Sequence, residues 1–154
     1  MIVFALLFSS VIAVSCKKGT ARVTHVIDGD TIVIQDEHST NKVRLAYIDA
    51  PKIKQIYGNK SKEYLTQLIY GKTVTIKPIT NDKYNRIIAE IYLNGRNINL
   101  IMIREGHAWL YRKYTDDKNF YDIGDNAEND AKAGKFGLWG SENFIPPCEF
   151  RKNY

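Results

Sequence analysis

The chain has 154 residues, and 22 Lys and Arg side chains against 17 Asp and Glu give it a net charge of +5. This length suits one domain with a real core and excludes two comfortable ones. The basic balance, with a pI near 9.1, favours nucleic acid or another polyanion over an acidic partner. No period of about 20 to 50 residues recurs after residue 19, which excludes a repeat architecture.

The first element is an uncharged leader, MIVFALLFSSVIAVS, followed by Cys16 and a basic pair. Its apolar run is shorter than the ~20 residues of a bilayer-spanning helix. Ala13 and Ser15 are small residues just before Cys16, as in a bacterial lipoprotein cleavage box. We therefore divide the chain into a leader and tether, residues 1–18, and one domain, residues 19–154. We expect an exported protein of the cell envelope or the extracellular space, anchored by a lipid on Cys16.

Two alternatives to the lipoprotein remain open. The leader lacks the usual Lys or Arg near its start, so it can also be an uncleaved anchor. Two cysteines in an exported protein can instead form a disulfide, here between Cys16 and Cys148. If Cys16 carries a lipid, we expect Cys148 to be a small packed residue.

Three strands in succession follow the leader. Alternating and β-branched residues predict them at residues 21–27, 31–36 and 42–48. Asp28 and Gly29 form the turn between the first two strands, because glycine accepts the positive φ of a tight turn. Asp30 then opens the second strand, where aspartate is disfavoured, so the turn alone does not explain it.

The second half of the chain mixes helices and strands. Apolar positions at helical spacing predict helices at residues 59–71, 97–106 and 119–134, and two strands lie between the first two of them, at residues 72–79 and 86–93. The residues expected on buried helix faces are Ser61, Tyr64, Leu65, Leu68 and Ile69 in the first helix and Phe120, Ile123, Ala127 and Ala131 in the third. Five strands and about three helices indicate an α+β, mainly β fold, a small closed antiparallel barrel of the OB type.

Two aspartates are predicted at neighbouring strand ends. The third strand stops at Asp49, because Pro51 forces the chain to leave the strand. Asp49 and Asp30 therefore lie at one mouth of the barrel, where their carboxylates can converge on a hard cation. Each of them taken alone is an ordinary turn residue.

Basic side chains are predicted beside these acids. Arg44 lies on the third strand, and Arg86 ends the loop NDKYNR that leads into the fifth. Two arginines next to a carboxylate-bound ion form a phosphate clamp, because guanidinium forks match phosphate oxygens and stabilise the charge that develops in phosphoryl transfer. We expect both arginines to be exposed at the mouth of a pocket.

These motifs together resemble the thermonucleases, the staphylococcal nuclease-like proteins. The blocks VIDGDTIVI, VRLAYIDAPK, YGNKSKEYL, DKYNRIIAEIYLNG, LIMIREGHAWLYRKY and GLW occur in the order of that family, from about Ala21 to Trp139. One block is a weak match, but six in order are specific. The resemblance implies an OB-fold barrel and Ca²⁺-dependent cleavage of DNA and RNA.

The same resemblance implies roles for particular residues. Asp30 and Asp49 match the calcium carboxylates, and the carbonyl of Ala50 stands where the family often has threonine. Asp28 matches an acid behind the metal ligands. The remaining matches are Arg44 and Arg86 as phosphate-binding, catalytic arginines, and Lys83, Tyr84 and Tyr114 as residues lining the nucleotide pocket. Arg112 stands where the family carries another tyrosine.

One residue departs from the family pattern. The family motif is Asp-x-Pro-Glu, and its glutamate is usually assigned as the general base, whereas this chain reads Asp49-Ala50-Pro51-Lys52. A lysine ammonium has no lone pair with which to accept a proton. Since general-base help is worth roughly 10² to 10⁴ in rate and enzymes commonly accelerate by more than ~10⁶, we expect a weakened enzyme rather than a dead one.

The sequence thus predicts a monomeric, Ca²⁺-dependent endonuclease that hydrolyses phosphodiester bonds of DNA and RNA and prefers single strands. Membrane contact is expected only through the leader or its lipid. A rival from another class is a non-catalytic OB-fold module that binds nucleic acid or nucleotide phosphates, with Lys52 as an added phosphate contact. A third reading is an envelope protein whose basic surface binds anionic lipid.

Overall fold

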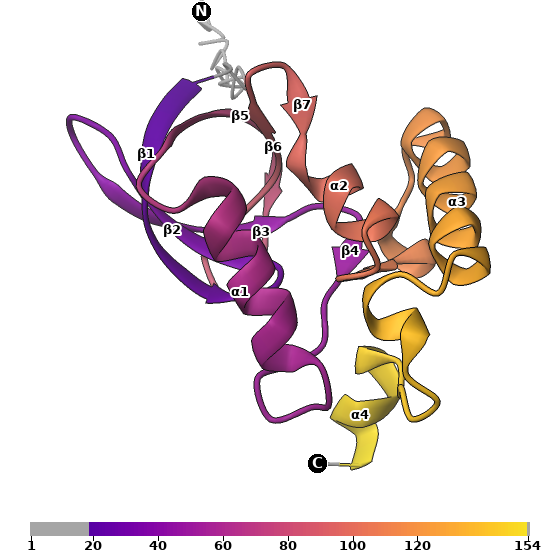
Figure 1. Ribbon diagram of the computed structural model, residues 1–154. Helices are drawn as coiled ribbons and strands as arrows, with labels where there is room; N and C mark the ends of the chain where they lie inside the picture. Colours follow the sequence, from indigo (N-terminus) through magenta and orange to yellow (C-terminus); the bar gives the residue numbers. More distant parts are fainter. Residues whose placement is uncertain (1–18, 154) are drawn as a thin grey trace, which may run out of the picture.

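Five strands close a barrel in the computed structural model, which describes residues 19–153 (Figure 1). The strands of the barrel are β1 (Gly19–Asp28), β2 (Thr31–Gln35), β3 (Thr40–Leu45), β5 (Thr73–Asn81) and β6 (Ile87–Leu93). Alternate side chains of each strand point inward. The inward set includes Val23, Ile32, Val43, Leu45 and Ile91, each essentially without exposed surface. The chain therefore forms the predicted OB-type barrel.

The closing strand pair corrects one detail of the prediction. Around the barrel, β3, β2, β1, β5 and β6 pair antiparallel in turn, but β3 and β6 pair parallel, with Val43 opposite Ile87. An antiparallel ring needs an even number of strands, since each neighbour reverses direction. With five strands the last pair must run the same way, so the barrel is mixed.

Helices cover one side and one end of the barrel. They are α1 (Gly58–Ile69), α2 (Ile98–Arg104), α3 (Lys118–Ala133) and α4 (Pro147–Asn153). The first three confirm the predicted helices, and the sequence does not predict α4, because Pro146 and Pro147 at its start and its seven-residue length hide any helical period. Two-residue strands β4 (Ile48–Asp49), β7 (Arg96–Asn97) and β8 (Trp109–Leu110) and 3-10 turns η1 (Arg112–Tyr114) and η2 (Gly137–Gly140) complete the described fold.

The predicted buried faces of the helices are largely correct. In α1, Ser61, Leu65 and Ile69 are buried, and Tyr64 and Leu68 pack against the core. In α3, the prediction that Ile123 is buried is wrong, because this side chain is 42% exposed. Glu128, which was not among the residues expected on the buried face, is fully buried. Glu128 can lie inside because Arg112 and Lys132 both pair with its carboxylate, each at 2.8 Å.

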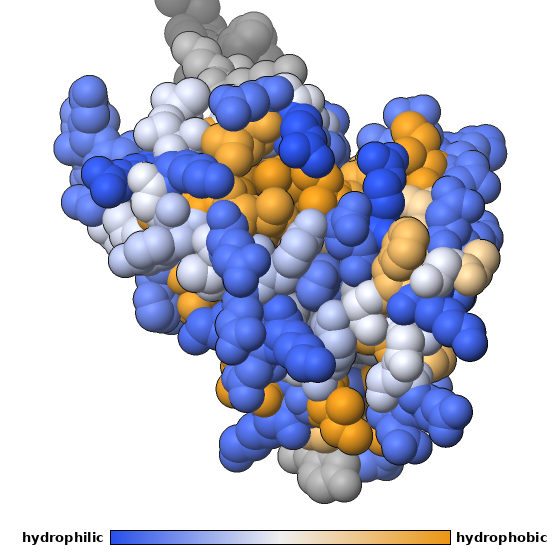
Figure 2. Space-filling model, viewed as in Figure 1, coloured by the Kyte–Doolittle hydropathy of each residue, from blue (hydrophilic) through white to orange (hydrophobic). Residues whose placement is uncertain are grey.

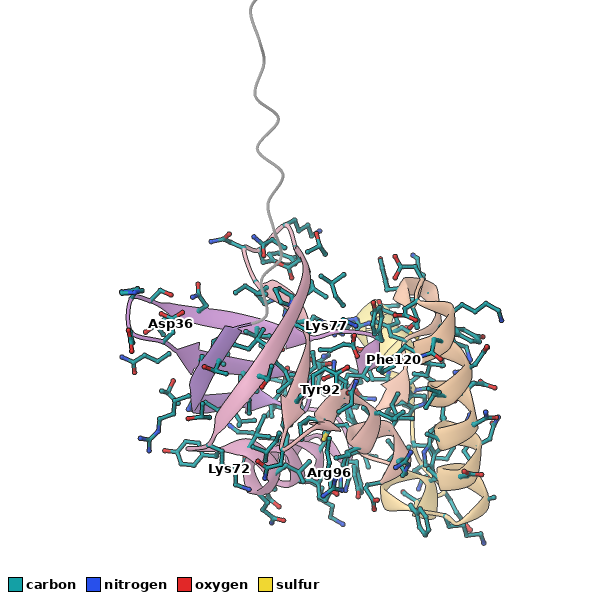
Figure 3. The ribbon with its side chains drawn as sticks, turned by 90° about the horizontal axis from the view of Figure 1, so that it is seen from above. Asp36, Lys72, Lys77, Tyr92, Arg96 and Phe120 are labelled. Atoms are coloured by element: carbon teal, nitrogen blue, oxygen red, sulfur yellow. The ribbon has the colours of Figure 1, made fainter. Side chains whose placement is uncertain are left out.

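Buried polar side chains join the helices to the barrel. Asn99 of α2 accepts from the Ile91 N–H at 3.0 Å and donates to the carbonyls of Ala46 and Ala89, which ties α2 to the strand ends. On the barrel wall Lys77 and Tyr92, both labelled in Figure 3, bond to the buried carboxylate of Glu90, at 2.6 and 2.8 Å. These bonds satisfy polar groups that would otherwise be costly to bury.

Hydrophilic residues cover most of the face shown in Figure 2; the largest group of apolar residues visible there lies over the barrel, and smaller ones lie at the upper right and at the lower end. Within residues 19–153, no helix combines the length and the apolar character needed to cross a bilayer. The leader and Cys16 lie outside the described residues, so export, lipid anchoring and the disulfide alternative stay predictions. Cys148 is exposed, contrary to the expectation that it is packed.

His107 gives stability a testable pH dependence. Its ring stacks on Tyr64 with centroids 3.8 Å apart, and burial lowers the pKa of His107 to about 4. The neutral ring is therefore favoured in the folded state, so its contribution is complete above the unfolded pKa of ~6.5 and is lost as the pH falls toward 4. Between about pH 8 and pH 5 we expect a loss of roughly 2 kcal/mol.

The check is urea unfolding across this pH range for His107→Phe, which keeps an aromatic ring on Tyr64. Its stability should fall by about 2 kcal/mol less than that of the wild type. The control is His25→Gln, which removes an exposed imidazole from β1. Parallel pH profiles for wild type and His107→Phe would contradict the assignment.

Candidate functional site

The turn between β1 and β2 explains why two acids stand side by side. Asp28 pairs with Thr31, and its carboxylate accepts the Asp30 backbone N–H at 3.0 Å, which holds the turn. Gly29 does not take the expected positive φ; it is needed because a Cβ there would lie 1.9 Å from the Ser61 hydroxyl oxygen of α1. The structure places Asp30 in the turn itself rather than at the start of the strand, since β2 begins at Thr31.

Asp30 is buried at the barrel mouth, with 1% of its surface exposed. One carboxylate oxygen accepts the Thr31 hydroxyl at 3.0 Å, and the other accepts the Ala50 N–H at 2.9 Å. The bond to Ala50 fastens the turn to the segment that carries Asp49. Asp30 and Asp49 are thus brought together as predicted.

Asp49 reaches the mouth by a different backbone route from the one predicted. The strand expected over residues 42–48 ends at Leu45, because Tyr47 takes a positive φ of 66° and turns the chain. A separate short strand, β4, then pairs antiparallel with β8, with Asp49 opposite Trp109. This pairing fixes the backbone of Asp49, whose side chain is 3% exposed.

Arg44 lies beneath the two aspartates. One guanidinium nitrogen donates to the carbonyls of Leu45 and Ile48, at 2.7 and 2.9 Å, and the other lies 3.5 Å from a carboxylate oxygen of each aspartate. Its side chain is only 13% exposed. The expectation of an exposed Arg44 is therefore wrong: the turn at Tyr47 wraps two carbonyls around the guanidinium, which gives this side chain a structural role as well.

Lys52 points into the acidic cluster. Its ammonium nitrogen lies 3.0 Å from Asp30, 3.8 Å from Asp49 and 4.0 Å from Asp28, and its side chain is 27% exposed. Its backbone N–H donates to the Gln55 side chain at 3.0 Å. The lysine that replaces the family's glutamate thus acts as a cation shared among three carboxylates.

The cluster balances its charges within the chain. Burial alone would raise the pKa of Asp30, but the charges of Arg44 and Lys52 outweigh it and hold that pKa well below its usual range. At Asp28, burial and the neighbouring Asp30 raise the pKa despite Lys52. Asp30 is therefore an anion over the whole physiological range, held in place by cations.

The second arginine, Arg86, lies at the end of the loop between β5 and β6. Ile88 pairs with Arg44, so Arg86, two residues before it, projects from the same side of the barrel wall. Its guanidinium pairs with Asp82 at 2.7 Å, and it is 27% exposed. The structure records no contact of Arg86 with Asp30 or Asp49 among the described side chains.

The residues predicted to line a nucleotide pocket are accessible. Tyr84 is 68% and Tyr114 58% exposed, and the Lys83 ammonium lies 5.1 Å from the centre of the Tyr84 ring. Arg112, in contrast, bonds to Asp125 and the buried Glu128 and so has a structural place. Aromatic rings with adjacent cations suit the stacking of unpaired bases.

Two residues at the cluster were missed by sequence reasoning. Arg151 of α4 forms a bidentate pair with Asp49, at 2.9 and 2.8 Å, and lies 3.4 Å from the Tyr111 hydroxyl. The Tyr111 ring also lies beside Arg44, 5.7 Å from its guanidinium carbon. Nothing local in the sequence marks Arg151, because it lies 102 residues from Asp49.

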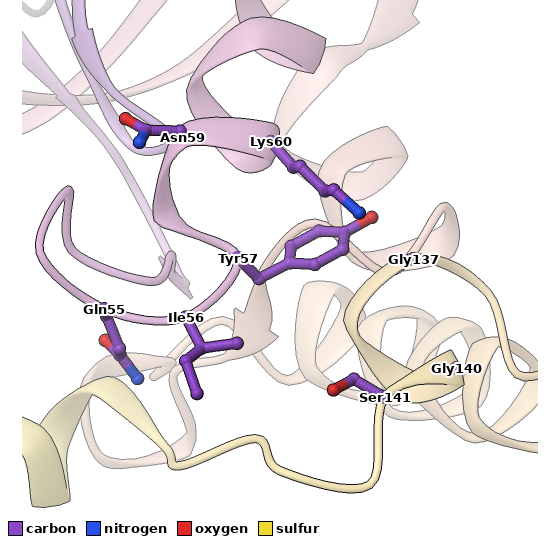
Figure 4. Close-up of a pocket in the computed structure, with 8 residues that line it drawn as sticks. All are labelled: Gln55, Ile56, Tyr57, Asn59, Lys60, Gly137, Gly140 and Ser141. Atoms are coloured by element: carbon purple, nitrogen blue, oxygen red, sulfur yellow. The ribbon is translucent and has the colours of Figure 1, made fainter.

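A pocket of about 500 Å³ lies elsewhere, beside the start of α1 (Figure 4). It is lined by Gln55, Ile56, Tyr57, Asn59, Lys60, Gly137, Gly140 and Ser141. No carboxylate belongs to this described lining, and Lys60 is its charged residue. The chemistry of an acid and arginine site is at the barrel mouth instead.

The donor set of the cluster fits a hard cation. Carboxylate and carbonyl oxygens are the ligands that Ca²⁺ prefers, and the ammonium of Lys52 marks a point on which three carboxylates already converge. Over residues 19–153, no group of three or more His, Cys, Asp or Glu side chains has the arrangement of a formed metal centre. A cation would therefore have to displace the positive side chains that the carboxylates now hold.

Comparisons with known proteins agree on one family. The model of the family described as "Staphylococcal nuclease homologue" matches residues 42–141. This match takes in Arg44, Asp49 and Arg86 and leaves out Asp30 and α4.

Several curated proteins are similar over most of their length. An "Uncharacterized endonuclease" of Haemophilus influenzae is 38% identical, over 96% of this chain and 81% of that protein. An "Uncharacterized endonuclease" of Escherichia coli is also 38% identical, over 90% of this chain and 88% of its own length. A "Micrococcal nuclease" of Shigella flexneri is 33% identical, over 84% and 79% respectively.

Proposed function

The chain belongs to the staphylococcal nuclease homologue family, and from this premise we propose that it hydrolyses phosphodiester bonds of DNA and RNA with Ca²⁺ at the barrel mouth. One observation carries the proposal: on an OB-type barrel, a guanidinium nitrogen of Arg44 lies 3.5 Å from a carboxylate oxygen of Asp30 and 3.5 Å from one of Asp49. Acids for a cation and a guanidinium for a phosphate are the groups that phosphoryl transfer requires.

The cation would be held by the carboxylates of Asp30 and Asp49 and by the carbonyl of Ala50. When bound there, Ca²⁺ supplies Lewis acidity toward a phosphoryl oxygen. Hydrogen bonds from Thr31 and Ala50 keep the Asp30 carboxylate oriented, and the β4–β8 pair does the same for Asp49. This fixed orientation limits the reorganisation that the reaction would otherwise require.

The arginines would bind the scissile phosphate and stabilise it as it changes. The oxygen of a water forms a bond to phosphorus, one ester P–O bond breaks, and the released oxygen takes up a proton. Negative charge grows on the phosphoryl oxygens during this step, and a guanidinium beside them lowers its energy. Arg44 is held in place by two carbonyls, and Arg86 is held by Asp82 in the loop between β5 and β6.

Lys52 is the reason to propose a reduced rate. The step needs an acceptor for the proton of the attacking water, and an ammonium cannot supply one. The Lys52 nitrogen also lies 3.0 Å from Asp30, where it competes with a cation for the same oxygen. Both effects would lower the rate of cleavage, and neither affects the phosphate-binding role proposed for Arg44 and Arg86.

Single-stranded nucleic acid is the substrate we propose. Tyr84 and Tyr114 present exposed rings, and unpaired bases can stack on such rings whereas paired bases cannot. Lys83 adds a positive charge at the Tyr84 ring that would contact the backbone of the strand.

A second candidate function is the non-catalytic binding module. The observation that favours it is again Lys52, whose ammonium neutralises the acids without a metal. In that case the same basic and aromatic surface would bind nucleic acid with no cleavage. The rate measured for Lys52→Glu, argued in the Discussion, separates the two functions.

The direct test is cleavage of single-stranded DNA and RNA by the full chain in Ca²⁺ or in excess chelator. We expect cleavage in Ca²⁺ and background rates in chelator. Asp30→Asn should weaken Ca²⁺ binding at least about tenfold by calorimetry, since it removes one of few formal charges from the site. The matched control is Asp36→Asn, in the exposed β2–β3 turn. Full cleavage in chelator, or unchanged Ca²⁺ affinity in Asp30→Asn, would count against the calcium site.

A further inference from the structure

The C-terminal helix delivers a third guanidinium to the acidic cluster. α4 spans Pro147–Asn153 and lies outside the residues that the family model matches. Its Arg151 donates through one terminal nitrogen to each carboxylate oxygen of Asp49, at 2.9 and 2.8 Å. Among such pairs this bidentate form is the strongest, because two parallel charged hydrogen bonds act together.

The pair is asymmetric in exposure. Asp49 is 3% exposed and its backbone pairs with Trp109 in β4–β8, whereas Arg151 is 38% exposed and lies near the end of the chain. Asp49 therefore stays in place if the pair breaks, and Arg151 is the partner that moves. Its guanidinium would be hydrated at once on leaving.

The segment before α4 has its own anchors. Phe144 packs on Trp139 and Trp109, with ring centroids 4.9 and 6.3 Å apart, and the Gln55 side chain donates to the Ile145 carbonyl. Gln55 also accepts the Lys52 N–H, so it links the loop that carries Lys52 to the segment before α4. Figure 1 shows this loop beside α4. These anchors would keep α4 near the site after Arg151 lets go of Asp49.

Arg151 and a divalent cation need the same oxygens. Both Asp49 oxygens already accept from Arg151, and one of them is also 3.5 Å from Arg44. A cation that draws on the Asp49 carboxylate must replace at least part of this pair, because two positive centres cannot both approach the same lone pairs closely.

We propose that Arg151 is a built-in competitor that sets the affinity of the site for its divalent cation, and that α4 leaves Asp49 when the cation binds. The inference rests on the calcium site of the proposed function. Because coupling between two equilibria is reciprocal, the factor by which Arg151 weakens cation binding is also the factor by which the cation loosens α4. A helix beyond the family's matched residues thus controls when the acids are available.

The first test is calorimetry with Ca²⁺ alone on the full chain. Arg151→Gln should bind Ca²⁺ about 5- to 30-fold more tightly than the wild type, which corresponds to about 1–2 kcal/mol. Lys152→Gln is the matched control: it removes the same charge from the next, exposed residue of α4 and should change the affinity less than about twofold. Unchanged or weaker affinity in Arg151→Gln, or equal tightening in both variants, overturns the proposal.

The second test follows α4 itself. A nitroxide on the exposed Cys148, in a Cys16→Ser background, reports the mobility of the helix by electron paramagnetic resonance. Saturating Ca²⁺ should make the label more mobile, and Arg151→Gln should make it mobile without Ca²⁺. A label that stays unchanged when calorimetry shows bound Ca²⁺ overturns the release of α4.

Failure of the inference can be told from failure of the function. If Ca²⁺ binds wild type and Arg151→Gln equally well, the competition by Arg151 is wrong and the calcium site stands. If Ca²⁺ binds neither protein, both the competition and the calcium site are wrong, whatever the rate of cleavage.

Discussion

Lys52→Glu should raise the rate of phosphodiester cleavage by up to ~10² to 10⁴ in saturating Ca²⁺, the range that general-base help is worth. The Lys52 nitrogen lies 3.0 to 4.0 Å from three carboxylates, so a side chain at position 52 reaches the centre of the site. A carboxylate there would accept the proton of the attacking water. The Lys52 ammonium, which competes with the cation for Asp30, would be absent.

The same substitution should make the fold depend on the cation. It removes the ammonium that neutralises Asp30 and adds a fourth carboxylate to Asp28, Asp30 and Asp49. Close like charges repel strongly in a site that is mostly shielded from water. Lys52→Glu should therefore melt below the wild type in chelator and recover when Ca²⁺ is added, since a ligand that binds the folded state stabilises it.

The measurement is single-turnover cleavage of a single-stranded oligonucleotide. Lys54→Glu is the matched control, because it makes the same charge change at an exposed position of the same loop. Affinity for the oligonucleotide without metal should fall in Lys52→Glu, with a salt dependence shallower by about one phosphate contact. Background rates in both wild type and Lys52→Glu, with Ca²⁺ shown to be bound, would favour the non-catalytic binding module.

Glu128→Ala should lower the free energy of unfolding by about 3–5 kcal/mol, as expected when one partner of a buried charged network is removed. The Glu128 carboxylate has no exposed surface; it pairs with Arg112 and Lys132 and accepts the Leu110 N–H at 2.9 Å. Leu110 belongs to β8, which holds β4 and Asp49 in register. Removing the Glu128 carboxylate should therefore make the backbone around Asp49 less ordered, in addition to destabilising the fold.

The control for Glu128→Ala is Asp125→Ala. Asp125 pairs with the same Arg112, at 2.5 Å, but its side chain is 36% exposed, so we expect less than about 1 kcal/mol. Urea unfolding near neutral pH measures both variants. Similar small losses in both would mean that the Glu128 network is not stabilising.

The pH dependence of this network has a definite sign. Burial alone would raise the pKa of Glu128, but the hydrogen bonds from Arg112, Lys132 and the Leu110 N–H hold it below its usual value. A lowered folded pKa stabilises above the unfolded value of ~4.3, and the contribution disappears as the pH falls through the folded pKa. The difference in the free energy of unfolding between wild type and Glu128→Ala should therefore become smaller in acid.

Local patterns predicted most elements within a few residues. The strands flanking Asp28 and Gly29, the amphipathic face of α1 and the two strands around the NDKYNR loop were visible because a period of two or 3.6 needs only neighbours in the chain. The parallel closure of β3 on β6 and the turn at Tyr47 were not visible, since both depend on where distant strands meet.

By itself, the sequence determined the barrel, its order of motifs and the family's acids and arginines, because strand alternation, turn chemistry and motif order are written in consecutive residues. Only the tertiary structure decided how these charges are partnered. Arg44 donates to two carbonyls, Lys52 is shared by three aspartates, and Arg151 reaches Asp49 across 102 residues. The physical reason is that the stability of a charged side chain depends on its burial and on the opposite charges nearest to it. Folding brings these groups together from distant segments of the chain.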